Sequence, residues 1–257
     1  MGKTWGMDDV VRGNRVAWEE ASGKYVREHD ELLERARGDG ARFFEREAEL
    51  LRPLLDDRPL VVHFQSGNGL DDIALVKAGA RQVVGVDYSA VAASSAQRRA
   101  AELGVSCQYV VAEVPGVPVQ DGAADLVYTG KGALIWMRDI GAWAEDVARV
   151  LRPGGHLFVY EAHPAVPLWT WDEDEPRIRP DRSYFAESHI NDTFPANGAQ
   201  EWQWKFGQIV TAIVAAGLQV ETLEEYAEPF WRPQDGHKAA AWSGRLPNAY
   251  ALLARRP

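Results

Sequence analysis

The sequence predicts an α/β fold, with a doubly wound, mostly parallel sheet and helices on both of its faces. From about residue 58 onward, short apolar runs alternate with helix-like segments, which is the pattern of repeated βαβ units. One apolar run, 60–64, leads directly into the glycine turn 65–69. The next apolar run closes on the carboxylate of Asp87. Together these observations predict a ligand site at the carboxyl edge of the sheet.

The first 57 residues are predicted to be helical and to form a lid. Apolar residues recur at helical spacing in two groups: Val10, Val11, Val16 and Trp18, then Phe43, Phe44, Leu50, Leu51 and Leu54. The run Gly38-Asp39-Gly40 is unfavourable inside a helix, so it marks a break between two helices.

The central part of the chain supplies five predicted strands, at 60–64, 83–86, 107–111, 125–128 and 156–161. Helices are predicted to begin at Asp71, to span 90–103 and to run from about 140 to 151. The last of these ends at Arg152-Pro153-Gly154-Gly155, because proline and glycine oppose continuation.

The composition changes after Glu161. Five prolines interrupt a charged, tryptophan-containing stretch: Pro164, Pro167, Pro176, Pro180 and Pro195. We predict a cap inserted at about 162–203, which either folds over the site or forms a partly mobile lid. A helix over 204–216 and two strands, 218–223 and 249–254, complete a main domain of residues 58–257.

Composition limits the class of protein. The net charge of −10 argues against broad nucleic-acid binding and favours a small-molecule partner, while the oligomeric state is not indicated. No apolar run of about twenty residues exists, which excludes a membrane span. The start, 1–6, has no apolar signal region, and the single Cys107 fits a reducing compartment, so we expect a cytoplasmic protein.

The glycine turn and Asp87 indicate the kind of ligand. Glycine allows close backbone approach, and a carboxylate can accept hydrogen bonds from both hydroxyls of a ribose. The dinucleotide fingerprint needs a third glycine where this chain has Asp72, and no triphosphate-binding loop is present. An acid near the helix start repels a pyrophosphate but favours a ligand that carries a positive sulfonium.

This window resembles the glycine motif of class I S-adenosylmethionine-dependent methyltransferases. The resemblance covers residues 58–162 and continues through Asp87-Tyr88-Ser89, Ala112-Glu113-Val114, Asp125-Leu126-Val127-Tyr128 and Leu151-Arg152-Pro153-Gly154-Gly155. The run His-Phe-Gln-Ser-Gly-Asn-Gly-Leu-Asp at 63–71 is similar to that of a bacterial subgroup of this family that acts on small molecules. The resemblance implies a Rossmann-like fold with an antiparallel C-terminal edge hairpin, and S-adenosylmethionine as the cofactor.

Two positions depart from the pattern of the family. The family usually has an acid where this chain has His63, and a glycine where it has Gln65. The missing acid normally helps to orient the methionine end of the cofactor. Gln65 can still present its backbone carbonyl to the amine of the ligand.

The expected cofactor contacts come from the glycine turn, the strand ends and the N-terminal helices: Phe64, Gln65, Gly67, Gly69, Asp87, Tyr88, Glu113, Val114, Thr129 and Tyr25. Glu113 would accept from the adenine amine, or else is a solvated acid. Tyr88 would stack on the adenine, or else packs at the strand end. Tyr25 and Trp18 either cover the cofactor or anchor their helix.

His163, just after the fifth strand, is the candidate catalytic base, because imidazole titrates near neutrality. The alternative is a loop histidine that bonds to the backbone, and an amine acceptor would need no strong base. His29 and His189 are weaker candidates, and Lys131 is expected to be solvated. The acidic run 172–175 is expected to be a solvated loop, and no metal site is predicted.

The sequence therefore predicts methyl transfer from S-adenosylmethionine to an oxygen or nitrogen, less readily a carbon, of a small molecule. The alternatives are an NAD-type oxidoreductase and a non-catalytic module that binds the cofactor. Six tryptophans beyond the fifth strand would suit an aromatic, sugar or cationic substrate, or else pack the cap onto the sheet: Trp169, Trp171, Trp202, Trp204, Trp231 and Trp242.

Overall fold

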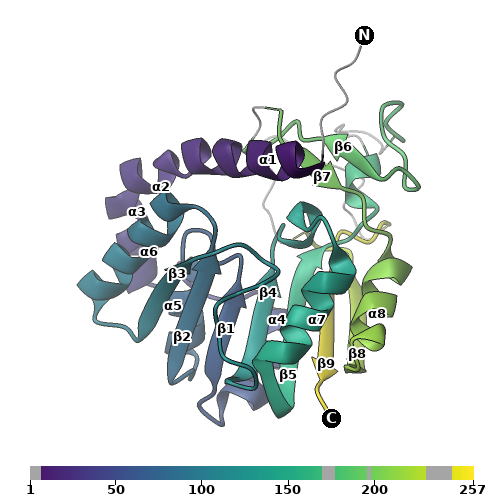
Figure 1. The fold of residues 1–257 in the computed structure, drawn as a ribbon. Coiled ribbons are helices and arrows are strands. Elements are labelled where there is room, and N and C mark those ends of the chain that lie inside the picture. Colours follow the sequence, from purple (N-terminus) through teal and green to yellow (C-terminus); the bar gives the residue numbers. More distant parts are fainter. Residues whose placement is uncertain (1–6, 170–176, 196–197, 230–244) are drawn as a thin grey trace.

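The computed structural model describes residues 7–169, 177–195, 198–229 and 245–257, and shows a single large sheet between two layers of helices (Figure 1). The seven strands lie in the order β3-β2-β1-β4-β5-β9-β8. Their bounds are β1 Leu60–Phe64, β2 Gln82–Asp87, β3 Cys107–Val111, β4 Ala124–Gly130, β5 Leu151–Ala162, β8 Gln219–Tyr226 and β9 Ala249–Arg255. The first five are parallel, and β9 is antiparallel to both β5 and β8. The predicted fold class is confirmed.

The helices are α1 Met7–Ala21, α2 Gly23–Arg27, α3 His29–Arg37, α4 Glu45–Leu55, α5 Leu70–Lys77, α6 Ala90–Leu103, α7 Ile140–Val150 and α8 Phe206–Ala215. Buried apolar side chains of α4, α5 and α6 form one core with one face of the sheet. Those of α7 and α8 form a second core with the opposite face. Both faces of the sheet are therefore covered, as a parallel sheet requires.

Two elements differ from the prediction in extent. Strand β5 begins at Leu151, and not at His156, because Leu151 already pairs with Ala124 and the ladder resumes after a register shift. Strand β4 continues through Thr129 to Gly130, so these residues end the strand and do not follow it. Neither change alters the order of the strands.

The hairpin of β6 Ser188–Ile190 and β7 Gln200–Trp202 was not predicted. Each of its strands has three residues, which is too short for alternation to be recognised. One-turn 3₁₀ helices, η1 Leu134–Trp136 and η2 Val166–Leu168, were also not predicted. Both hairpin strands lie within the stretch that the sequence assigned to a cap.

Helix α1 and the hairpin lie side by side above the carboxyl ends of the parallel strands (Figure 1). The Asn14 side chain fixes this arrangement, because its Nδ2 donates to the Gln200 carbonyl at 2.7 Å and its Oδ1 accepts from the Gln200 N–H at 2.8 Å. The Trp18 ring meets the Trp136 ring edge to face, with centroids 5.6 Å apart. Together, α1 and the β6–β7 hairpin form a roof over the carboxyl edge of the sheet.

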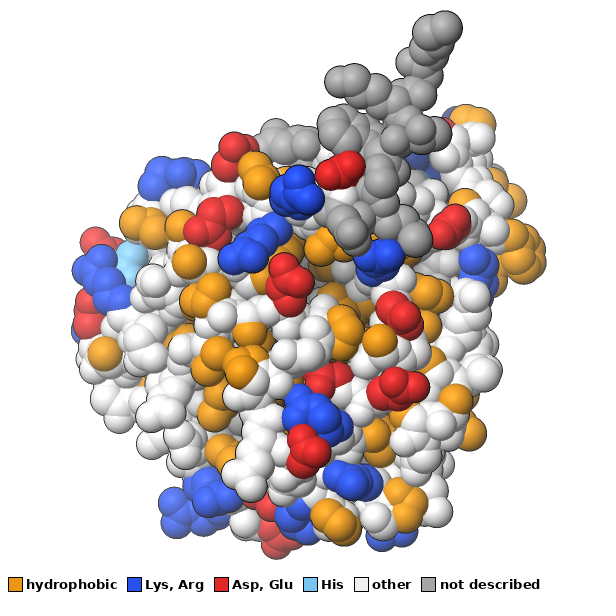
Figure 2. Space-filling view, in the orientation of Figure 1, with side chains coloured by type: hydrophobic (Ala, Val, Ile, Leu, Met, Phe, Trp, Pro, Cys, Tyr) orange, Lys and Arg blue, Asp and Glu red, His pale blue; other side chains and the backbone are white. Residues whose placement is uncertain are grey.

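Acidic and basic side chains are interspersed over the described surface in the view of Figure 2, with no continuous basic patch on that face. Within the part of the chain that the structure describes, no helix has the length and apolar character needed to cross a bilayer.

Truncation of Phe158, which is fully buried in β5, should reduce the free energy of unfolding by about 3–5 kcal/mol. The physical reason is the loss of its burial, together with the cavity that Ala leaves beside the stacked ring of Tyr128. Val214→Ala on α8, at a side chain that is 55% exposed, is the control and should change it by less than about 0.5 kcal/mol. Urea unfolding of both variants measures this, and equal losses would contradict the assigned core.

Candidate active site

A cavity lies at the carboxyl edge of the sheet, between the strand ends and the roof. Its floor and walls come from the turn after β1, the ends of β2, β3 and β4, and η1. Residues of α1, α2 and β7 close it from above. This is the edge at which open α/β sheets bind ligands, because loops there converge at the change of strand order.

The two glycines of the turn have different roles. A Cβ added to Gly69 would lie 2.5 Å from Tyr109 Oη and 2.7 Å from Ala96 Cβ, so this position serves close packing. Gly69 was expected to contact the cofactor, but it does not line the cavity. Gly67 does line it, and a Cβ there would meet nothing within 4 Å. Space for a ligand is therefore found beside Gly67.

The Asp87 carboxylate joins the end of β2 to the glycine turn. Its Oδ2 accepts from the Gly67 N–H, and its Oδ1 from the Ser89 N–H, each at 2.9 Å. Burial raises the pKa of Asp87, and these two backbone bonds oppose that rise. Because each carboxylate oxygen can accept a further hydrogen bond, Asp87 can still bind two hydroxyl groups that enter the cavity.

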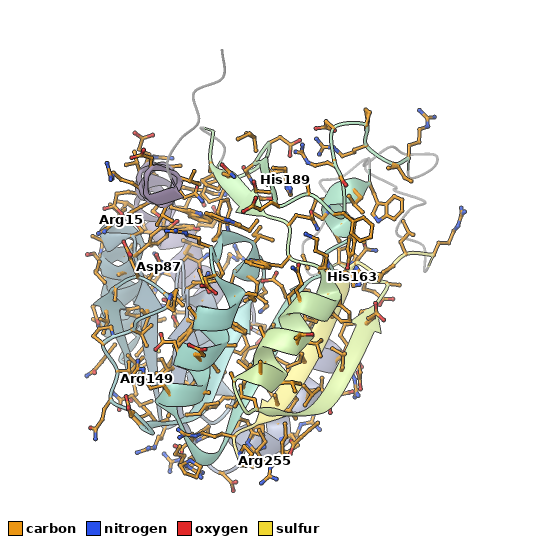
Figure 3. The ribbon with its side chains drawn as sticks, turned by 45° about the vertical axis from the view of Figure 1, so that its right-hand side comes forward. Arg15, Asp87, Arg149, His163, His189 and Arg255 are labelled. Carbon is orange, nitrogen blue, oxygen red and sulfur yellow. The ribbon has the colours of Figure 1, made fainter. Side chains whose placement is uncertain are left out.

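The other expected contacts beside Asp87 also line the cavity. Tyr88 is largely buried, which raises its pKa, and its hydroxyl donates to the Asn14 carbonyl of α1 at 3.4 Å. Glu113, next to Val114, is exposed and forms a 3.6 Å ion pair with Arg15 of α1. The strand ends and the roof are thus linked on the side where Figure 3 shows Arg15 and Asp87.

Phe64 and Thr129 do not line the cavity, although Gln65 and Tyr25 do. Phe64 is fully buried in the core, and its carbonyl accepts from Thr129 Oγ1 at 3.2 Å. Gln65 donates from Nε2 to the Ala133 carbonyl at 2.7 Å, which fixes its side chain across the cavity wall. Burial raises the pKa of Tyr25 to about 12, so its hydroxyl stays neutral.

Lys131 was expected to be solvated, and this expectation is wrong. Its Nζ lies 2.6 Å from Asp71 Oδ1 and 3.2 Å from Glu47 Oε1, and the side chain is 16% exposed. Glu47 is fully buried, which raises its pKa, and it accepts from the Tyr128 hydroxyl at 2.5 Å. The sequence could not show this cluster, because Glu47 belongs to α4, far from the strand ends along the chain.

Two further buried groups at the site were not assigned a role from the sequence. His63 Nδ1 lies 2.6 Å from Asp72 Oδ1, and His63 lines the cavity. Glu161 is buried at the end of β5 and fixes the loop after β4. Its carboxylate accepts from four backbone N–H groups, those of Gly132, Ala133, Leu134 and Ala162.

His163 lies outside the cavity and well separated from Asp87 (Figure 3). Its Nε2 pairs with Glu225 Oε1 at 3.0 Å, and its Nδ1 accepts from the Ala165 N–H at 3.1 Å. Burial lowers the pKa of His163, and Glu225 opposes that effect. Both ring nitrogens are therefore engaged in holding the start of the insertion. His29 and His189 do not line the cavity either.

Trp18, Trp136 and Trp202 line the cavity together with Met137. Trp204 instead donates from its indole N–H to the Met137 carbonyl at 2.7 Å, which supports that wall from behind. Trp171, Trp231 and Trp242 lie outside the described residues, as does the acidic run 172–175. Within the described ranges no group of three or more His, Cys, Asp or Glu side chains could hold a metal ion.

Residues 61–155 match the family model described as a methyltransferase domain. A malonyl-[acyl-carrier protein] O-methyltransferase of Hahella chejuensis is 41% identical over 49 residues, which are 19% of this chain and 17% of that protein. The curated relatives that this chain matches are aligned with it over 17% to 35% of their own length.

Solved structures are similar over most of the chain. An S-adenosylmethionine-dependent methyltransferase from Mesorhizobium loti superposes with a TM-score of 0.64 and 23% identity, covering 81% of this chain and 96% of that one. A geranyl diphosphate C-methyltransferase from Streptomyces coelicolor, in complex with Mg²⁺, geranyl diphosphate and S-adenosylhomocysteine, gives 0.58 and 15%, covering 82% and 79%. At these identities the likeness concerns the fold.

The two glycines should respond differently to the same substitution. Gly69→Ala forces a clash as well as a left-handed residue at φ 77°, and should reduce the free energy of unfolding by about 2–4 kcal/mol. Gly67→Ala, at φ 55° and with free space around it, should cost only the backbone part, about 1 kcal/mol. Chemical denaturation of the pair measures the difference. If the two losses are equal, Gly69 does not serve close packing.

Proposed function

We propose that this protein is an enzyme that transfers a methyl group from S-adenosylmethionine to a small molecule. Residues 61–155 match a methyltransferase domain, and the fold is similar to that of S-adenosylmethionine-dependent methyltransferases. The acceptor atom is an oxygen or a nitrogen, with carbon less favoured. The observation that carries the proposal is Asp87, a buried carboxylate fixed at the end of β2 and open to the cavity beside Gly67.

The residues around the cavity suit S-adenosylmethionine better than a phosphate-containing nucleotide. Asp87 places a negative charge at the wall that is not paired with Lys131. The cation among the described lining residues is Lys131, and its charge is balanced by Asp71 and Glu47. A pyrophosphate would therefore meet like charges, whereas a sulfonium is attracted to them. These charges, and the absence of the third glycine, argue against an NAD-type oxidoreductase.

We assign the ribose hydroxyls to Asp87, and the adenine to the wall of Tyr88, Glu113 and Val114. When bound, S-adenosylmethionine supplies an electrophilic methyl group. The protein then has to orient the acceptor and exclude water, which are effects of position and enclosure. The roof of α1 and β7, held together by Asn14, supplies the enclosure, and in this sense the N-terminal helices form a lid.

The acceptor is proposed to bind against the aromatic wall of Trp18, Trp136 and Trp202. Large flat side chains provide apolar contact area there. Among the described residues of this wall none is a general base, and His163 is engaged elsewhere. An acceptor that is already nucleophilic, such as a neutral amine, would need no such base.

Binding and turnover test the proposal separately. Calorimetry with S-adenosylmethionine, S-adenosylhomocysteine and NAD should show binding of the first two only. Transfer of labelled methyl from S-adenosylmethionine to members of a panel of small amines, phenols and acids should then be detected. Tight binding of NAD would support an oxidoreductase, and cofactor binding without transfer to any acceptor would indicate a binding module.

Asp87→Asn should lower the affinity for S-adenosylhomocysteine by at least about tenfold, because it weakens two charge-assisted hydrogen bonds. The affinity of the unchanged protein should also fall as the pH decreases through the raised pKa of Asp87, since protonation removes the same acceptor. Asp121→Asn, at an exposed carboxylate paired with Arg149, is the matched control and should bind normally. Unchanged affinity in Asp87→Asn would remove Asp87 from the ribose site.

A further inference from the structure

The cavity has a polar part and an aromatic part. His63, Asp71 and Lys131 line the polar part, next to the glycine turn. Trp18, Trp136 and Trp202 line the aromatic part. Burying a charged group against an apolar wall is costly unless it is paired or hydrogen-bonded. The amino-acid end of S-adenosylmethionine, which carries an ammonium and a carboxylate, is therefore expected in the polar part.

The contact with Asp72 decides which nitrogen of His63 can accept a hydrogen bond. His63 Nδ1 lies 2.6 Å from Asp72 Oδ1, and both side chains are buried, at 3% and 0% exposure. A carboxylate only accepts, so the proton of the neutral ring lies on Nδ1 and the lone pair lies on Nε2. Nε2 has no hydrogen-bond partner among the residues that the structure describes.

The position of His63 in the sheet separates it from the aromatic wall. His63 lies in β1, the strand that leads into the glycine turn, and pairs in register with Tyr128 of β4. The Tyr128 ring packs edge to face on the imidazole, with centroids 4.8 Å apart. Trp18 and Trp202 belong to the roof, on α1 and β7. His63 therefore lies on the floor of the cavity, where a ligand held by Asp87 would rest.

We propose that neutral His63, oriented by Asp72, accepts a hydrogen bond at Nε2 from the α-ammonium of the cofactor. The inference rests on the proposed function and adds a positioning residue to it. The ammonium is the partner because a lone pair can accept only from a donor, and the cofactor carboxylate offers none at neutral pH. A histidine and aspartate pair thus takes a place where similar enzymes have an acid.

The comparison of S-adenosylhomocysteine with 5′-methylthioadenosine tests this contact, because the second ligand has the ribose and adenine but no amino-acid end. By calorimetry, His63→Phe should lower the affinity for S-adenosylhomocysteine at least about tenfold and change that for 5′-methylthioadenosine less than about twofold. His63→Gln, which restores an acceptor, should recover part of the loss. His29→Phe, at a buried histidine paired with Glu102 outside the cavity, is the matched control and should bind both ligands normally.

Equal losses for both ligands in a folded His63→Phe overturn the role of His63. If neither ligand binds the unchanged protein, the proposed function itself fails.

Discussion

The arrangement of the site depends on buried carboxylates that hold backbone N–H groups at the carboxyl edge of the sheet. Asp87 binds the amides of Gly67 and Ser89, and so fixes the glycine turn to the end of the neighbouring strand. Glu161 does the same for the loop after β4, where it accepts from four amides. Burial disfavours the charged form of both carboxyl groups and raises their pKa. The hydrogen bonds from the backbone N–H groups oppose this effect and stabilise the buried carboxylates. A rigid cavity wall is the result.

The same edge carries a balance of charge that selects the ligand. Lys131 sits between Asp71 and Glu47, so its charge is used within the protein and is not free to bind a phosphate. Asp87 remains a buried acid open to the cavity. A ligand with a ribose and a positive centre fits these conditions, whereas a pyrophosphate does not. The electrostatics of the walls and the geometry of the turn therefore favour the same cofactor.

The sequence predicted what local patterns determine. The bounds of β1, α6 and β3 agree with the prediction, because apolar runs and glycine or proline breaks mark them within a few residues. It did not predict the β6–β7 hairpin, whose strands are too short to show alternation. The ion pair of Lys131 with Glu47 joins residues far apart in the chain, so no local pattern could show it. His163 was placed at the correct edge, yet its contacts with Glu225 and Ala165 come from tertiary packing.

The central claim is that this cavity holds S-adenosylmethionine with its ribose on the carboxylate of Asp87. A crystal structure of the protein with S-adenosylhomocysteine tests it most directly. We expect both ribose hydroxyls within hydrogen-bonding distance of Asp87 and the backbone of Gly67 against the ligand. A ligand that binds elsewhere, or lies in this cavity with its ribose turned away from Asp87, would contradict the account.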